Sequence, residues 1–221
     1  MAKGRPRERL LEAADELFRA EGVAAVGVGR VIEHAEVAQM SLWRVFGSKQ
    51  GLVDEWLRGV DERGLAQLRA ASQGAVAPRV KLAAVFDAWA SRADDPGFRG
   101  CPLVNAAAEP GGAGPAAVAV ARQHKQETQG LLVALAGEAG LAEPAAIALQ
   151  WLFLMEGCAV AVGLGVVAKD AAAAARAAAL TLFDAAPRAR SVRSGRGAPA
   201  NVGSGAAAAS RRSRGARRPP S

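Results

Sequence analysis

The sequence predicts an all-α protein with three parts: an N-terminal three-helix domain, a larger helical domain and an arginine-rich C-terminal tail. The chain is rich in alanine and leucine, contains no tyrosine and has few runs of β-branched residues, a composition that favours helices over strands. Apolar residues recur every three or four positions through most of the first 186 residues, which is the helical period. Glycine and proline separate these periodic segments and mark the expected ends of the helices.

The first sixty residues have the pattern of a helix-turn-helix unit. A first amphipathic helix is expected to end near Gly22, since glycine is a common C-terminal stop. Two short helices follow, at about 28–35 and 39–46, joined by a tight turn. Ser48 is a suitable N-cap for a longer connecting helix. The apolar residues expected to face inward are Leu10, Leu11, Ala14, Leu17, Phe18, Val28, Val31, Ile32, Leu42, Phe46, Leu52, Val53, Trp56, Leu57 and Val60.

Longer helical segments fill the chain beyond Gln73, and the composition changes again at Pro187. From there Arg, Ser, Gly, Ala and Pro replace nearly every large apolar residue, so the tail is expected to be disordered. We expect three parts: a helix-turn-helix domain at 1–60, a ligand-binding and dimerisation domain at 61–186 and a basic tail at 187–221. The helices expected in the second part lie at about 78–94, 101–109, 115–138, 143–166 and 170–186.

The net charge of +7 comes from the tail. Residues 1–60 carry nine Lys or Arg and nine Asp or Glu, and residues 61–186 carry ten basic and twelve acidic side chains. Residues 187–221 add nine arginines and no acid. The tail therefore has two readings: sequence-independent attraction to DNA through counterion release, or a solvated, inert extension. The high isoelectric point is no evidence for a basic face on the folded part.

Several protein classes are disfavoured by the sequence. The two cysteines, Cys101 and Cys158, are too few for a disulfide framework and are interpreted as small buried apolar residues of a cytoplasmic protein. No H-E-x-x-H, G-x-S-x-G or phosphate-loop motif is present, so we expect no enzyme, no cofactor and no metal site. Residues 145–168 are apolar enough to span a membrane, but Gln150 and Glu156 interrupt them, and a helix buried at a dimer interface explains them better.

Two stretches of sequence resemble one family. RERLLEAADELFRAEG followed by SLWRVFGSKQGLV, within residues 7–57, resembles the N-terminal domain of tetracycline-repressor (TetR) type regulators. DPGFRGCPLVNAAAE, residues 95–109, is similar to a recurrent piece of the ligand-binding domain in one branch of that family. The resemblance implies a cytoplasmic homodimer that represses transcription from a palindromic DNA operator and is released by an unidentified small-molecule effector, with no membrane partner.

The resemblance makes the second short helix a recognition helix, which lies in the major groove of DNA. With Leu42 and Phe46 turned inward, the outward side chains can reach base edges: glutamine suits adenine, and arginine suits guanine or a phosphate. The ammonium of Lys49 and the amides at the start of the following helix can clamp a phosphate. The residues expected to contact DNA are Gln39, Met40, Ser41, Trp43, Arg44 and Lys49, together with Lys3, Arg5 and Arg7 of an N-terminal arm.

Several positions depart from the family pattern. Val26 and Gly27 stand where Ser or Thr usually caps the second helix, and Glu36 stands where the turn usually has glycine. If that position needs a positive φ, glutamate costs about 1 kcal/mol or more. Met40 replaces the usual glycine and Trp43 the usual tyrosine. These departures leave two readings open: an altered operator preference, or a weakened DNA-binding head.

The second domain is expected to hold the effector and the dimer interface. A ligand pocket needs apolar walls and a few polar anchors, although any single aromatic residue is more often part of the core. Small residues on the last two helices, among them Gly157, Ala161, Gly163 and Gly165, favour close packing against a second copy. The candidate ligand contacts are Phe86, Trp89, Phe98, Asn105, Trp151, Phe153 and Met155, with Glu109, His124 and Glu156 as polar points.

Two alternatives to an operator-reading repressor stay open. The chain could be a helical regulator that has lost operator reading and binds a ligand or a protein instead. It could also be a sequence-tolerant DNA-binding protein that acts through its basic tail. Removal of the tail separates the last reading from the others, because it would abolish DNA binding only there.

Overall fold

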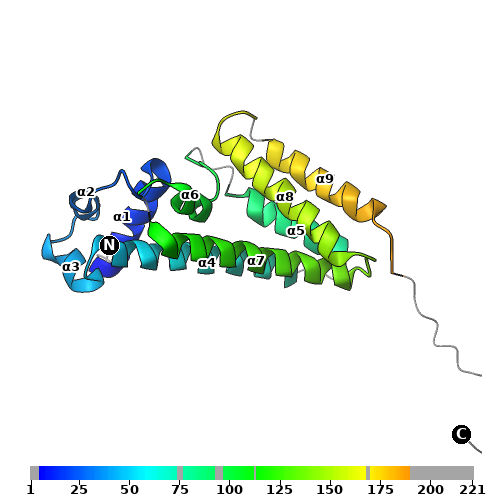
Figure 1. The fold of residues 1–221 in the computed structure, drawn as a ribbon, viewed down its shortest axis with the longest axis horizontal. Helices are drawn as coiled ribbons and strands as arrows, with labels where there is room; N and C mark the ends of the chain where they lie inside the picture. Colours follow the sequence, from blue (N-terminus) through cyan, green and yellow to red (C-terminus); the bar gives the residue numbers. More distant parts are fainter. Residues whose placement is uncertain (1–4, 74–76, 93–96, 112, 168–169, 190–221) are drawn as a thin grey trace, which may run out of the picture. The chain divides into compact units, whose positions relative to one another are not determined.

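The computed structural model of the chain describes residues 5–73, 77–92, 97–111, 113–167 and 170–189. Within these ranges it contains helices and no strand, so the all-α prediction is confirmed (Figure 1). Each expected helix is present, although the one expected at 78–94 ends at Ala90. Lys3 and the tail from residue 190 lie outside the described residues. The helices are α1 (Pro6–Glu21), α2 (Val28–His34), α3 (Met40–Phe46), α4 (Lys49–Gln73), α5 (Pro78–Ala90), α6 (Pro102–Ala108), α7 (Gly114–Glu138), α8 (Pro144–Gly163) and α9 (Ala171–Ala185).

The helices α1, α2, α3 and the first half of α4 pack around one hydrophobic core. The ring of Trp56 meets Phe18 edge to face at 5.2 Å between centroids. Its indole Nε1–H donates to Asp15 Oδ1 at 2.7 Å, so the polar end of the side chain is also satisfied. The predicted cap of α4 is confirmed, because Ser48 Oγ accepts a hydrogen bond from the Gly51 N–H at 2.9 Å. This core holds α3 at the surface against α1 and α4.

The turn between α2 and α3 contains a strained residue. Glu36 has a φ of 47°, the one positive φ of a non-glycine residue in the part of the chain that the structure describes. The positive φ on which the expected strain depends is therefore confirmed, and this left-handed conformation costs a residue with a Cβ about 1–2 kcal/mol. The exposed Glu36 carboxylate also pairs with Arg9 Nη2 at 3.0 Å, a surface contact that contributes little to stability.

We expect Glu36→Gly to stabilise the chain by about 0.5–1 kcal/mol, because the relieved strain exceeds the extra freedom of glycine in the unfolded chain. Urea unfolding followed by circular dichroism measures the change. The matched control is Glu33→Gly, because Glu33 lies within α2, where glycine should destabilise by about 0.5–1 kcal/mol. A Glu36→Gly variant that is no more stable than the unmodified chain would contradict the strain.

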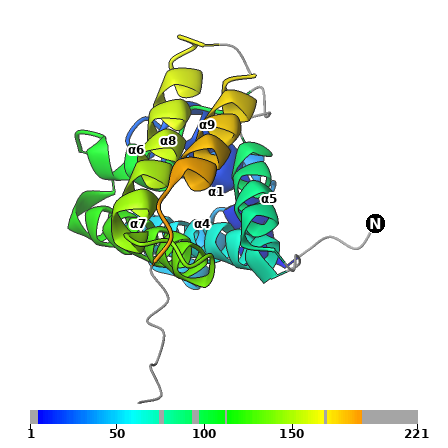
Figure 2. The same ribbon diagram turned by 90° about the vertical axis from the view of Figure 1, so that its right-hand side faces the viewer.

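Five helices form a ring around the second hydrophobic core (Figure 2). The helix α4 packs on α5 and α7, and α8 and α9 close the ring between those two. Trp151 of α8 lies inside it with none of its surface exposed. Its ring stacks on Phe183 of α9 at 6.2 Å, and its Nε1–H donates to the carbonyl of Ala179 at 3.1 Å. The aromatic pair and this hydrogen bond join α8 to α9.

The long helices α4 and α7 and the short helix α6 connect the ring to the head, the unit formed by α1, α2, α3 and the first half of α4. Apolar side chains of α4 belong to both cores: Trp56 and Leu57 to the first, and Leu68 to the second. The short helix α6 packs on α4 and α7, and its Leu103 and Ala106 complete the first core. The head core is therefore built from residues on both sides of the expected domain boundary at residue 60.

The polypeptide stays in contact with the fold slightly beyond the point at which the tail was expected to begin. The Ala142 N–H donates to the carbonyl of Pro187 at 2.9 Å, and the Ala189 N–H donates to the carbonyl of Gly140 at 2.8 Å. The expectation that disorder begins at Pro187 is therefore wrong for residues 187–189, because backbone pairing with the loop after α7 holds them.

Among the described residues, α8 is the one helix long and apolar enough to cross a membrane by length and composition. A single such helix is weak evidence for a membrane protein, because the core helix of a soluble protein passes the same test. Here one side of α8 faces the second core through Ile147, Trp151 and Met155. Its apolar character is thus explained in part by packing within the chain.

Candidate functional site

The helix α3 presents an exposed face made of residues predicted to contact DNA. Leu42 is completely buried and Phe46 is half-buried, which turns the remaining side chains outward. Met40 is 63% exposed and Trp43 is 43% exposed, unusually high values for large apolar side chains. A short helix that projects such a face can enter the major groove. The predicted contacts on it are Gln39, Met40, Trp43 and Arg44, which are exposed, and Ser41, which is half-buried.

The residues predicted to contact phosphates differ in their exposure and in their partners within the chain. Lys49 is half-buried, and its ammonium donates to the carbonyl of Val23 at 2.7 Å, so it has a partner within the head. Arg7 is half-exposed and forms an ion pair with Glu55 of α4. Arg5 is exposed immediately before α1. Lys3 lies outside the described residues. The structure therefore places Arg5 and Arg7 at the surface, whereas Lys49 also ties the loop after α1 to α4.

A cavity of about 850 Å³ lies among the ends of several helices and is a candidate ligand site. Its walls come from α1 and the loop after it, from α4, from α5, α6 and the segment between them, and from α7 and α8. This volume is within the usual range for small-molecule pockets, about 300–1,000 Å³. Four of the predicted contacts line it: Trp89, Phe98, Asn105 and Met155. The three predicted polar points do so as well: Glu109, His124 and Glu156.

The other predicted ligand contacts lie elsewhere. Phe86 and Trp151 are completely buried in the second core and do not line the cavity. Periodicity could not separate these residues from Trp89, because core and pocket residues share the inward face of a helix. Phe153 is 63% exposed and points away from the core. The cavity thus brings together the predicted residues near the α5–α6 segment, and the predicted residues at the centre of the ring do not line it.

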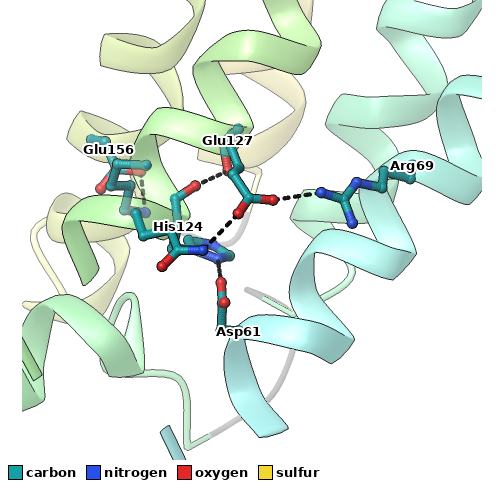
Figure 3. A network of polar contacts seen from close by, with 8 residues as sticks. Asp61, Arg69, His124, Glu127 and Glu156 are labelled. Carbon is teal, nitrogen blue, oxygen red and sulfur yellow. Dashed lines mark hydrogen bonds and ion pairs between the residues drawn. The ribbon is translucent and has the colours of Figure 1, made fainter. Parts of the chain in front are cut away.

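A network of polar side chains lies beside the cavity (Figure 3). His124 of α7 is only 4% exposed, and its Nδ1 lies 2.7 Å from Asp61 Oδ1 of α4. Burial lowers the pKa of His124, although the hydrogen bond to Asp61 acts in the opposite direction. The imidazole is therefore neutral at pH 7, with Nδ1–H donating to the carboxylate. Lys125 pairs with Glu156 of α8 at 2.7 Å.

Glu109 joins the cavity wall to the head. Its carboxylate accepts hydrogen bonds from the N–H groups of Val23 at 2.9 Å and Ala24 at 3.1 Å, in the loop between α1 and α2. The Glu109 carboxylate can lie this close to the loop because residue 22 is a glycine: a Cβ at that position would lie 2.4 Å from Glu109 Oε1. Gly22 also has a φ of 96°, which favours glycine. A displacement of the end of α6 would therefore pull directly on the loop that enters α2.

Sequence reasoning missed Arg92, which lines the cavity just beyond α5. It is half-buried, and its guanidinium has no hydrogen bond or ion pair with any of the residues that the structure describes. Burial lowers the pKa of Arg92. The sequence did contain a signal for this residue. Arg92 follows Phe86 and Trp89 at three-residue spacing, which places a charged side chain on the same helix face as two aromatic ones. No cluster of three or more potential metal-ligating side chains occurs in the described ranges.

The outer side of α8 carries an exposed apolar stripe. We use this name for Leu149, Phe153, Val160 and Leu164, which are spaced so that they share one face of the helix. Gly157 lies on the same face, and a Cβ there would have nothing within 4 Å. Exposed apolar residues in a continuous row are typical of a contact surface.

Gly163, by contrast, packs within the chain. A Cβ at that position would lie 2.6 Å from the carbonyl carbon of Arg99 and 2.8 Å from the backbone nitrogen of Gly100. The small size of Gly163 is therefore accounted for by the fold of a single chain, without the second copy for which the sequence proposed it.

Comparison with known proteins places the head and the whole fold among bacterial regulators. Residues 10–56 match the model of a family described as bacterial regulatory proteins, tetR family. A TetR-family transcriptional regulator from Streptomyces coelicolor is 28% identical, with a TM-score of 0.73 over 81% of this chain and 94% of that one. A tetR-type transcriptional regulator from Streptomyces avermitilis is 29% identical, with a TM-score of 0.69 over 84% of this chain and 100% of that one.

More distant structures share the fold alone. The regulatory protein TetR from Rhodobacter sphaeroides is 21% identical, with a TM-score of 0.67 over 80% of this chain and 98% of that one. None of the curated proteins compared with the chain shows significant sequence similarity to it.

Proposed function

The chain belongs to the tetR family of bacterial regulatory proteins, and we propose that it is a homodimeric repressor released from a palindromic operator by a small-molecule effector. The observation that carries the proposal is the exposed face of α3, in which Met40 and Trp43 project from the head beside Arg44. The proposal places the protein in the cytoplasm, where its DNA is, and assigns it no catalytic activity.

The recognition step would use the side chains of α3. Gln39 and Arg44 supply the donors and acceptors that read adenine and guanine in the major groove. The indole of Trp43 can donate to a phosphate, and Arg5 and Arg7 lie at the surface at the start of α1. Because the charges of the head cancel, each head alone should bind weakly, and two heads on a two-fold axis would be needed for operator affinity.

The cavity and Glu109 support control by an effector. The cavity is bounded on one side by the α5–α6 segment and on the other by α7 and α8, so an occupant would contact the elements that position α6. Glu109, at the end of α6, holds the backbone of the head at Val23 and Ala24. An effector that shifts α6 would therefore change the position of the head, and with it the spacing of two heads on DNA.

The exposed apolar stripe of α8 supports dimerisation. The residues of α9 that face outward include Ala173, Ala174 and Ala177, which are small enough for another helix to approach closely. Two copies of α8 and α9 would form a four-helix interface that covers the stripe. This arrangement would also remove from water the apolar face that makes α8 resemble a membrane-spanning helix.

The proposed function is tested by selecting operators from a random duplex library at near-physiological salt. The unmodified chain, a chain truncated after Arg190 and the Arg44→Ala variant are compared, with Arg122→Ala as the control because Arg122 is exposed on α7. We expect a shared palindrome with half-sites separated by one helical turn or a multiple, about 34–36 Å per turn. Arg44→Ala should weaken binding to that palindrome by about 1–3 kcal/mol per contact, and Arg122→Ala should not.

The outcomes separate the readings that the sequence left open. Recovery of the same palindrome by the truncated chain would show that the tail is not needed for operator reading. Binding that selects no motif and disappears with the tail would overturn the proposed function in favour of sequence-tolerant DNA binding. The absence of any binding would overturn it in favour of a regulator that has lost operator reading.

We expect Phe153→Lys to convert a dimer into a monomer, because it places a charge in the middle of the stripe, where it would be desolvated. Sedimentation velocity measures the mass, and operator binding should fall with it by at least about 10-fold. The matched control is Val80→Lys, since Val80 is also an exposed apolar residue but lies on α5. A Phe153→Lys chain that sediments as the unmodified protein does would exclude the stripe from the interface.

A further inference from the structure

The charged side chains around the cavity are nearly all paired within the chain. Asp15 accepts from the indole of Trp56 and from Arg19 Nε at 2.9 Å. Glu156 is neutralised by Lys125, as described above, and Glu109 accepts two backbone N–H groups. Each of these carboxylates therefore already accepts hydrogen bonds from donors within the chain.

Arg92 is the exception among the described cations of the wall. Arg19 has Asp15, Lys125 has Glu156, and Arg99 Nη1 donates to the carbonyl of Ala20 at 2.7 Å. The guanidinium of Arg92 has no such partner in the described part of the chain, and it is half-buried at the cavity. The nearby Glu156 carboxylate offsets part of the desolvation of Arg92 but forms no hydrogen bond with it. An anion placed directly against the guanidinium would recover more of that energy.

The position of the guanidinium is defined by Gly64 of α4. A Cβ on Gly64 would lie 3.2 Å from Arg92 Nη1 and 3.1 Å from His124 Cε1. Arg92 and the edge of the imidazole therefore lie close together in the space that a larger residue would fill. Because burial keeps His124 neutral, the imidazole does not repel the guanidinium. The Arg92 guanidinium thus lies next to a ring that can take up a proton.

The rest of the wall is suited to an apolar body. Leu68, Trp89, Phe98 and Met155 line the cavity, and the amide of Asn105 lies among them. One guanidinium fork binds one carboxylate or sulfonate in a two-pronged manner, whereas a phosphate dianion would leave charge uncompensated.

We propose that the effector of this cavity is an organic monoanion, an apolar molecule whose single acid group pairs with Arg92. The inference rests on the proposed function, which makes the cavity an effector site. It goes beyond that function by naming the chemical class of the ligand and the residue that selects it. Neutral molecules with the same apolar body should bind more weakly.

The experiment compares two fluorescent probes with the same aromatic body. 1-Anilinonaphthalene-8-sulfonate carries an acid group, and N-phenyl-1-naphthylamine does not. The full chain should bind the sulfonate probe about 10- to 100-fold more tightly than the neutral one. Arg92→Met should remove that preference and leave the affinity for the neutral probe unchanged, and Arg92→Lys should keep part of it. Arg122→Met, at an exposed arginine of α7, should behave as the unmodified chain.

A second measurement does not depend on the folding of an Arg92 variant. The chain has only two histidines, so His34→Asn leaves His124 as the single imidazole signal in a proton NMR titration. An anion bound beside Arg92 should raise the pKa of His124, because it favours the charged imidazole, and the neutral probe should not.

Three results would overturn the inference. The first is equal affinity of the unmodified chain for the two probes, and the second is an equal loss of affinity for both probes in Arg92→Met. The third is a His124 pKa that binding of the sulfonate probe leaves unchanged. Probe binding is measured without DNA. A protein that selects an operator but shows any of these results would therefore contradict only the ligand class. A protein that selects no operator would contradict the proposed function whatever the probes do.

Discussion

Replacing Trp151 with alanine should destabilise the chain by about 3–5 kcal/mol, the largest effect that we expect from a single substitution. The side chain is completely buried at the centre of the ring of five helices, so its removal leaves a large cavity. The substitution also removes the stacking contact with Phe183 and leaves the carbonyl of Ala179 without its donor. Urea unfolding followed by circular dichroism measures the loss.

Trp43→Ala is the matched control, because it makes the same chemical change on the exposed face of α3. It should alter stability by no more than about 0.5 kcal/mol, while weakening operator binding. The two tryptophans thus separate folding from recognition. A Trp151→Ala chain as stable as the Trp43→Ala chain would mean that the ring closes over the missing side chain, contrary to the packing described above.

Glu109→Ala should have the second largest effect, a loss of about 1–3 kcal/mol, because it leaves the buried N–H of Val23 without an acceptor. It should also weaken the effect of an effector on operator binding, since the end of α6 would no longer hold the loop after α1. Stability is measured by urea unfolding, and the coupling is measured as the ratio of operator affinities with and without the effector.

Two further variants make the Glu109 result interpretable. Glu143→Ala is the control, because Glu143 is exposed before α8 and its side chain does not cap that helix. Gly22→Ala should reproduce the loss by a different route, since its methyl group would displace the Glu109 carboxylate and strain a backbone with positive φ. If Glu109→Ala is as stable as Glu143→Ala, the contact between α6 and the head does not hold the two together.

The sequence was sufficient for the fold because helix periodicity and stop signals are local. Gly22, Gly47 and Ser48 mark ends that the structure confirms, and the strain at Glu36 followed from a single departure in a turn. The spacing of Leu42 and Phe46 was also sufficient to define the outward face of α3. In each case the controlling interactions lie within a few residues along the chain.

The cavity could be predicted only in part, because it is formed by segments distant in sequence. Trp89 and Phe86 have the same character along α5, and only the packing of α7 and α8 places one at the cavity and the other in the core. The partner of Glu109 lies 86 residues away at Val23, a contact that no local pattern indicates. For the same reason, the sequence could not show that the Arg92 guanidinium lacks a hydrogen-bond partner among the described residues.

The helix α4 contributes to two cores, and this has a consequence for how the molecule unfolds. Its first half is packed by the head and its second half by the ring, without a break between Lys49 and Gln73. Unfolding of either core would expose apolar residues of α4, and α4 also supplies residues to the other core. The head and the ring should therefore melt in a single cooperative transition. Inherited changes deep in the ring, far from α3, would then lower occupancy of DNA by reducing the population of folded molecules.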